Sequence, residues 1–243
     1  QNSDASFIHY VTDGKLRPSQ GRRGVGFPLE SKLHIDLTDV VSLLCVRQAP
    51  DDPPSRTSSS LTLYNEILRR RPEALARLYE GFEWDRMDEH GLGETPTSGY
   101  KVPVFSQKDG VISCQYNRNW MSNAAERNDK PLTNDENAIF DLIDEIAAET
   151  CLEFPFHTGD IQFCNNYTCL HGRAAHAVVD EEEHKRVLMR IWIDLDDPRP
   201  FADEAVIRCG NSRHGQIGWT PAEILSGANT KPRSRRADGA VAI

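Results

Sequence analysis

Residues 33–47 read Leu-His-Ile-Asp-Leu-Thr-Asp-Val-Val-Ser-Leu-Leu-Cys-Val-Arg and are the most informative stretch of the chain. The second half is a near-continuous apolar run, which is typical of a buried β-strand. The first half places His34 and Asp36 on either side of Ile35. Because residues two apart in a strand point to the same side, His34 and Asp36 are expected to share a face, with Ile35 toward the opposite layer.

A second histidine completes this pair far along the chain, in residues 165–173, Asn-Asn-Tyr-Thr-Cys-Leu-His-Gly-Arg. Two imidazoles and one carboxylate can occupy one face of an octahedral Fe(II) ion and leave the other positions open. A lone His-x-Asp is a weak signal, and His176 is an alternative partner for it. We favour His171 because it follows the Gly159-Asp160 turn and the next strand directly. The sequence therefore predicts a metal site made of His34, Asp36 and His171.

The remaining pattern alternates strand signals with two helices. Pro72 is expected to split the first helix, Asp109-Gly110 marks a hairpin, and Thr133 with Glu136 forms a capping box. This order favours an α+β domain built round a mostly antiparallel barrel or sandwich. The expected elements are strands near 7–11, 102–105, 111–116, 161–165 and 187–195, a loop over 48–57, and helices over 61–82 and 133–150.

Length and composition suit one soluble domain. The chain has 243 residues, 38% of them hydrophobic, and no apolar run of about 18 residues that would predict a membrane span. A net charge of −9 argues against nucleic acid as a partner, and the basic residues 231–236 are expected to be a solvated tail. Six cysteines without a Cys-x-x-Cys pair favour a reducing, cytoplasmic location.

Three further motifs carry a family resemblance: Asp39-Val-Val-Ser-Leu-Leu-Cys45, Gly159-Asp-Ile-Gln-Phe163 and Arg186-Val-Leu-Met-Arg190-Ile-Trp192. In this order the chain resembles the TauD/TfdA family of Fe(II)/2-oxoglutarate-dependent dioxygenases, of the clavaminate-synthase-like superfamily. The resemblance implies a double-stranded β-helix (jelly-roll) core with flanking helices. It also implies Fe(II), 2-oxoglutarate and O2 as cofactor and co-substrates, with release of succinate and CO2.

The resemblance also assigns roles to individual residues. His34, Asp36 and His171 would be the iron ligands. Arg186 would grip the distal carboxylate of 2-oxoglutarate, since a guanidinium binds a carboxylate through two parallel hydrogen bonds, and Arg190 would reach an acidic group of the substrate. Three further residues receive roles. Ser58 would hydrogen-bond the same distal carboxylate, with its neighbours Thr57, Ser59 and Ser60 leaving the register open. Asn117 and Asn166 would lie at the substrate pocket.

The sequence is expected to form a single catalytic domain over residues 1–243. It comprises an irregular segment over 1–30, a jelly-roll core with helical insertions over 31–200 and an extension over 201–243. The expected function is oxidation of an unactivated C–H bond in a small carboxylate- or amino-acid-like molecule. Neither nucleic acid nor a membrane is expected as a partner, and a homo-oligomer is left open. A carboxylate at Asp36 favours hydroxylation, desaturation or oxidative cyclisation over halogenation.

Competing interpretations remain at this point. His34 and Asp36 can be read as an exposed strand pair with a local hydrogen bond. Arg186 and Arg190 can be read as solvated strand positions that pair with nearby acids. A non-catalytic jelly-roll protein that retains the metal site is one alternative function. A zinc hydrolase with a metal-bound water is another.

Overall fold

The computed structural model describes residues 8–12, 30–86, 95–176, 179, 181–193, 195, 197, 199 and 200. The basic residues 231–236 and the proposed extension over 201–243 lie outside the described residues, as does most of the segment over 1–30. No helix among the described residues is long and apolar enough to cross a membrane.

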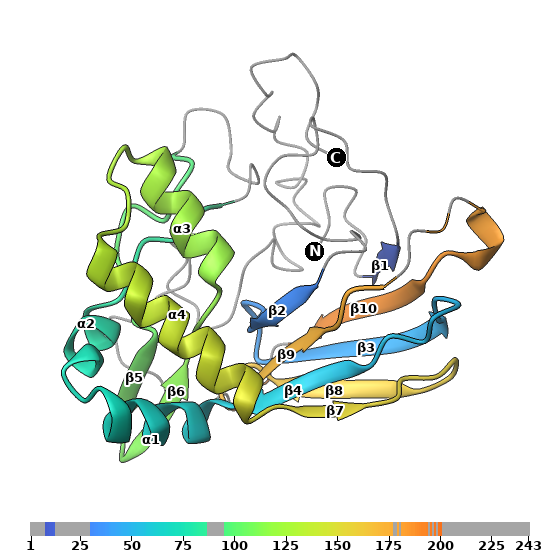
Figure 1. Cartoon of the computed structure of the whole chain (residues 1–243), viewed down its shortest axis with the longest axis horizontal. Helices are drawn as coiled ribbons and strands as arrows, with labels where there is room; N and C mark the ends of the chain where they lie inside the picture. The colour runs from blue at the N-terminus through green and yellow to red at the C-terminus, as the bar shows by residue number, and fades with distance from the viewer. Residues whose placement is uncertain are drawn as a thin grey trace.

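Two four-stranded sheets carry the fold, and every strand pair in them is antiparallel (Figure 1). The first sheet has the order β1 (Ile8–Thr12), β10 (Val187–Ile193), β3 (Val40–Arg47) and β8 (Ile161–Asn165). The second has the order β2 (Ser31–His34), β9 (Cys169–Arg173), β4 (Ser55–Ser59) and β7 (Leu152–Phe154).

The two sheets face each other across a shared interior. Alternate residues of the first sheet are buried, as in Val41 and Cys45, whereas Phe163 on the other face is 64% exposed. Ser55 of β4 donates a hydrogen bond across the interior to Oε1 of Gln162 on β8, at 2.8 Å. Polar and charged side chains can therefore enter the space between the sheets while the other face of the second sheet packs on helices.

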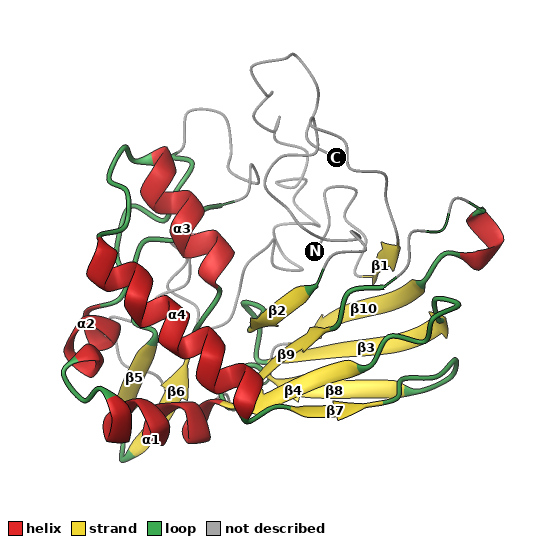
Figure 2. Ribbon diagram, viewed as in Figure 1, coloured by secondary structure: helices red, strands yellow, loops and turns green. Residues whose placement is uncertain are grey.

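Four α-helices of the described part of the chain cover that other face, and Figure 2 shows them gathered on one side of the sheets, whereas the short 3-10 helix Glu182–His184 lies at the other end, before β10. The main apolar core lies here and includes Leu170 of β9, Leu63, Phe140 and Ile143. As predicted, the first helix is divided near Pro72 and Thr133 forms a capping box with Glu136. The helices are α1 (Ser60–Arg70), α2 (Ala74–Glu80), α3 (Arg118–Arg127) and α4 (Asn134–Glu149).

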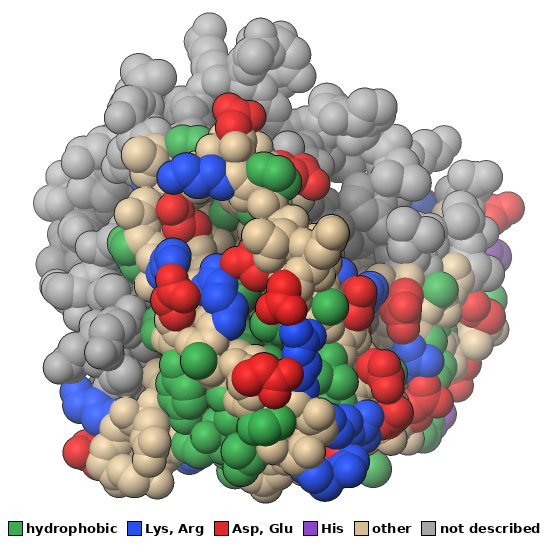
Figure 3. Space-filling model, turned by 60° about the vertical axis from the view of Figure 1, so that its left-hand side comes forward, with side chains coloured by type: hydrophobic (Ala, Val, Ile, Leu, Met, Phe, Trp, Pro, Cys, Tyr) green, Lys and Arg blue, Asp and Glu red, His purple; other side chains and the backbone are tan. Residues whose placement is uncertain are grey.

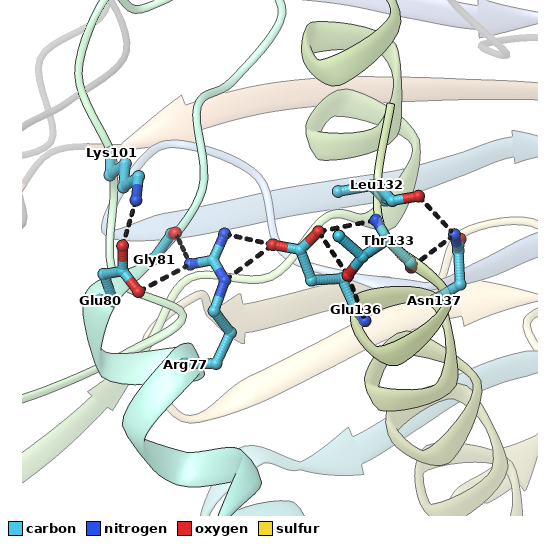
Figure 4. A network of polar contacts seen from close by, with 8 residues as sticks. All are labelled: Arg77, Glu80, Gly81, Lys101, Leu132, Thr133, Glu136 and Asn137. Carbon is cyan, nitrogen blue, oxygen red and sulfur yellow. Dashed lines mark hydrogen bonds and ion pairs between the residues drawn. The ribbon is translucent and has the colours of Figure 1, made fainter. Parts of the chain in front are cut away.

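A polar network joins α2 to the start of α4 (Figure 4). The guanidinium of Arg77 donates to Oε1 of Glu136 at 2.8 Å and also to the carbonyl of Gly81. The other carboxylate oxygen of Glu136 accepts from the backbone N–H of Thr133 at 2.8 Å. Glu136 therefore caps its own helix and ties it to α2 at once. On the helical side, basic and acidic side chains are interspersed over the surface (Figure 3).

The predicted hairpin is present, with its first arm shifted. β5 (Phe105–Lys108) and β6 (Val111–Cys114) form a separate two-stranded sheet. Asp109 and Gly110 both have positive φ, 52° and 76°, as the two central positions of a type I′ turn require. The strand predicted over 102–105 is instead Phe105–Lys108, so its first residue is the last residue of the predicted range.

Several short elements differ from the prediction. Residues 48–57 were expected to be loop, but β4 begins at Ser55, because its residues pair with both β9 and β7. Polar Ser-Arg-Thr-Ser-Ser lacks the apolar alternation that marks a strand, so its pairing partners decide its structure. Neither α3, with few apolar residues, nor the three-residue β7 was predicted.

Candidate metal centre

His34 and His171 are brought together by strand pairing. They lie directly opposite each other in the antiparallel β2–β9 pair, and the centroids of their rings are 4.6 Å apart. Directly paired residues of an antiparallel sheet place their side chains on the same face. β2 ends at His34, so Asp36 lies two residues beyond the strand rather than in it. One donor atom each from His34, Asp36 and His171 nevertheless lie within 4.8 Å of one another.

A glycine permits the close approach of these two strands. A Cβ added to Gly172 would lie 2.4 Å from the carbonyl oxygen of Ser31 and 3.2 Å from that of Lys32. The β2–β9 register also shifts between Ser31 and His34, which is the mark of a bulge. The absence of a side chain at Gly172, next to the metal-binding His171, thus allows the imidazole of His34 to reach its partner.

The backbone around Asp36 is held from two sides. Ile35 donates its N–H to the carbonyl of Tyr116 at 2.9 Å, and its side chain enters the helix-side core as predicted. Asp36 donates its N–H to Oδ1 of Asn166, and Nδ2 of Asn166 donates to the carbonyl of Thr38, both at 3.0 Å. The buried amide of Asn166 is therefore occupied on both ends. Asn166 lies in the turn after β8 and braces the 36–38 segment, while its predicted contact with substrate stays a prediction.

The protonation states of Asp36 and His171 suit a cation. Burial alone would raise the pKa of Asp36, but the charges of Arg190, His171 and His34 and the hydrogen bond from Trp192 lower it to about 2. Burial, with the nearby charges of His34 and Arg190, lowers the pKa of His171 to about 3 against the opposing effect of Asp36. Near neutral pH the site thus presents an ionised carboxylate and a neutral His171 imidazole.

The hydrogen bonds of the imidazoles leave lone pairs for a metal. Nδ1 of His34 lies 2.6 Å from the carbonyl of Lys32, so this nitrogen carries the proton and Nε2 is left as an acceptor. His171 has a buried Nδ1 with no hydrogen-bond partner among the described residues, and its Nε2 is 3.8 Å from Oδ2 of Asp36. A neutral imidazole whose Nε2 lies near an ionised carboxylate, with one donor atom from each of the three side chains within 4.8 Å of the others, fits a bound divalent cation.

Arg190 and Trp192 of β10 both reach Asp36. Nη1 of Arg190 is 3.3 Å from Oδ2 of Asp36, and Nε1 of Trp192 donates to the same oxygen at 2.9 Å. The alternative that Arg190 is a solvated strand position is therefore wrong, because its side chain is 14% exposed and contacts a buried carboxylate. The role of Trp192 was missed from the sequence, although it stands on the same strand face as Arg190.

Arg186 is buried at the start of β10. Its Nε donates to Oε1 of Gln48 at 2.9 Å, and Gln48 in turn donates from Nε2 to the carbonyl of Phe156. Arg186 lies four positions before Arg190, which corresponds to about 13 Å along an extended chain. The two arginines therefore lie at different ends of the interior: Arg190 contacts the metal-binding Asp36, and Arg186 lies farther away, beside Gln48.

Ser58 does not share the face of the metal-binding side chains. Ser58 points to the helix side, where its Oγ is 3.0 Å from Oγ1 of Thr150 after α4. Thr57, one residue earlier, pairs directly with His171 and so shares the face of the metal-binding side chains. Because a shift of one residue moves a strand side chain to the opposite face, Thr57 rather than Ser58 lies on the interior side.

Asn117 has a structural role in α3. It is the N-cap of this helix, where its side-chain oxygen accepts from the N–H of Trp120 at 3.4 Å. The preceding Tyr116 carbonyl holds Ile35, so Asn117 is near the metal-binding segment in the chain path. The prediction that it contacts substrate remains untested.

An antiparallel scaffold bearing two histidines and one carboxylate defines a metal-binding class of protein, and comparison with known sequences identifies its family. A profile of the family described as "Taurine catabolism dioxygenase TauD, TfdA family" matches residues 5–192. The chain therefore belongs to the TauD/TfdA family.

Two curated relatives agree with this assignment. FR-33289 synthase of Streptomyces rubellomurinus is 30% identical over 175 residues, which cover 69% of this chain and 50% of the relative. Taurine hydroxylase-like protein SAT17 of Stachybotrys chartarum is 30% identical over 171 residues, which cover 68% of this chain and 42% of the relative. The chain thus spans about half the length of the curated relatives it matches.

Solved structures share the fold. Asparagine oxygenase, crystallised with Fe(II), 3-hydroxyasparagine and succinate, has a TM-score of 0.60 at 14% identity, covering 77% of this chain and 56% of its own. The non-haem iron oxygenase OrfP, crystallised with Fe and α-ketoglutaric acid, has a TM-score of 0.53 at 16% identity, covering 79% and 57%. At these identities the likeness concerns the fold.

Proposed function

We propose that this protein is an Fe(II)- and 2-oxoglutarate-dependent dioxygenase of small molecules. The observation that carries the proposal is the convergence of His34, Asp36 and His171 in a member of the TauD/TfdA family. Two nitrogens and one carboxylate are the donor set of a non-haem iron site with open positions. We also propose that the two sheets form a double-stranded β-helix and that residues 1–243 constitute one catalytic domain.

In this proposal His34, Asp36 and His171 hold the iron. When bound, iron and 2-oxoglutarate supply the oxidising chemistry from O2, with succinate and CO2 as co-products. Asp36 stays ionised and His171 stays neutral because of the pKa shifts described above, so neither has to lose a proton to a buffer when the metal binds near neutral pH. Asn166 and Tyr116 keep the Asp36 segment in place.

Arg186 is proposed to hold the distal carboxylate of 2-oxoglutarate. It is a buried cation well away from the metal-binding side chains, and a five-carbon diacid that chelates the metal at one end requires such a partner at the other. Thr57, which shares the face of His171, is proposed to provide the accompanying hydroxyl in place of Ser58.

The substrate is proposed to be a small molecule with a carboxylate or amino-acid-like group. Arg190 places a guanidinium beside the metal-binding side chains, where an acidic substrate group can approach it. Two structural neighbours were crystallised with hydroxylated amino acids, 3-hydroxyasparagine and (3S)-hydroxy-L-Arg respectively, which supports the same substrate class. The proposed outcome is hydroxylation, desaturation or oxidative cyclisation.

Anaerobic addition of Fe(II) and 2-oxoglutarate tests the proposal. We expect a visible metal-to-ligand charge-transfer band, and succinate formation once O2 is admitted. A protein that binds metal but forms no succinate would be the non-catalytic alternative. Hydrolytic activity sustained by Zn(II) without 2-oxoglutarate and O2 would favour the hydrolase.

Paired arginine variants then separate the two guanidinium roles. Arg186→Ala is expected to raise the KM for 2-oxoglutarate at least about tenfold, because it removes a charge-assisted hydrogen-bond partner. Arg190→Ala should raise the KM of the primary substrate. If Arg190→Ala leaves that KM unchanged while Arg186→Ala raises the KM for 2-oxoglutarate, the acidic-substrate assignment is wrong and the co-substrate assignment stands.

A further inference from the structure

Asp36, Arg190 and Trp192 form a closed cluster, here called the carboxylate clamp. Oδ2 of Asp36 accepts from Nε1 of Trp192 at 2.9 Å and lies 3.3 Å from Nη1 of Arg190. The guanidinium carbon of Arg190 is 5.0 Å from the centroid of the Trp192 ring, a distance suited to a cation–π contact. Each member therefore contacts both of the others.

Asp36 needs such support because of its place in the chain. It lies beyond the end of β2, where the strand ladder no longer orders the backbone, and Asn166 holds only its N–H. The rotamer of the carboxylate must be set by contacts to the side chain itself. The donors on Oδ2 come from β10, which is paired with β1 on one side and β3 on the other and is therefore firmly placed.

The two donors differ in their effect on a cation. Arg190 carries a full positive charge, which orients Asp36 but also repels a metal ion bound to it. Trp192 is a neutral donor, so it orients the carboxylate without that repulsion. It is also held in register opposite Val41, a fully buried residue of β3.

We propose that Trp192 is a positioning residue that sets the orientation of the Asp36 carboxylate toward the metal. The inference rests on the proposed metal site and names a residue outside the three metal-binding side chains. Removing the indole N–H should weaken metal binding by about tenfold or more, since partners that orient metal ligands commonly contribute 10- to 100-fold to affinity. Removing the charge of Arg190 should weaken it less or strengthen it.

Metal binding itself provides the test, measured by anaerobic titration with Co(II) and its visible d–d spectrum. Trp192→Phe removes the donor and keeps a ring beside Arg190. Trp192→Met is a second donor-free variant, whose flexible side chain fills irregular space should the first variant fail to fold. Trp84→Phe is the matched control, because the Nε1 of this buried tryptophan has no hydrogen-bond partner among the described residues.

The expected result is a Kd for Co(II) raised about tenfold or more in Trp192→Phe and Trp192→Met, with an altered d–d spectrum, while Trp84→Phe matches the wild type. Wild-type Kd values, within twofold, and an unchanged spectrum in a folded Trp192 variant would overturn the inference. If the wild-type protein binds neither Co(II) nor Fe(II), the proposed function itself fails. The two failures are thus told apart by the wild-type titration.

Discussion

Substitution of Gly172 by alanine should separate the two metal-binding histidines. The new Cβ would lie 2.4 Å from the Ser31 carbonyl oxygen, whereas ordinary contact begins at 3.4 Å, so β2 and β9 have to separate locally by about 1 Å. Overpacking of this kind costs about 1–3 kcal/mol of unfolding free energy. Metal–ligand distances tolerate only about 0.2 Å, so a displacement near 1 Å at His34 should raise the Kd for a divalent metal roughly 100-fold.

The assay is a Co(II) titration paired with urea denaturation of the metal-free protein. Gly110→Ala is the matched control: its φ of +76° strains an alanine, but its Cβ would meet nothing within 4 Å and it lies in the β5–β6 turn. The control should lose about 1–2 kcal/mol of stability and keep its metal affinity. A Gly172→Ala protein with the wild-type Kd would refute the close-approach argument.

Three further predictions concern the same site. Asn166→Ala should lower the free energy of unfolding by about 2–3 kcal/mol in urea denaturation and raise the Kd for Co(II), because it leaves the N–H of Asp36 and the carbonyl of Thr38 unpaired. An unchanged Kd would contradict the bracing role. The metal-free protein should lose stability as pH falls from 6.5 toward 3, and His171 should contribute up to about 1.4 kcal/mol per pH unit to this loss. The reason is that the folded pKa of His171, about 3, lies below the unfolded value, so the unfolded chain binds the proton first. A flat stability profile over that range would show that the pKa of His171 is not lowered in the folded protein. Thr57→Val should raise the KM for 2-oxoglutarate several-fold, whereas Ser58→Ala should leave it unchanged, and the reverse result would overturn the register assignment.

Long-range features of the site could be predicted where residue chemistry is distinctive. The His34-Ile35-Asp36 alternation and His171 indicated one metal site, and the structure brings these side chains together. The helix at Thr133 and the hairpin at Asp109 were also predicted, because capping boxes and Asp-Gly turns are local signals.

The strand register and the hydrogen-bond partners of the residues around the metal site could not be predicted in this way. Thr57 and Ser58 are both small hydroxyl residues, and only the pairing of β4 with β9 shows which one faces the interior. The two hydrogen bonds of Asn166 could not be predicted, because they join it to a segment about 130 residues away in sequence. Trp192 escaped notice for the same reason: a tryptophan in an apolar strand predicts packing, and only its contact with Asp36 shows a polar role.

The position of β2 has a consequence for the coupling of metal and structure. This four-residue strand is at the edge of its sheet, with β9 as its one neighbour in the described strand order. An ion bound by both His34 of β2 and His171 of β9 would cross-link the edge strand to the rest of the sheet. Pairing of β2 with β9 and binding of the ion are then thermodynamically coupled. The free energy by which the ion stabilises this pairing grows with the logarithm of the ratio of metal concentration to Kd.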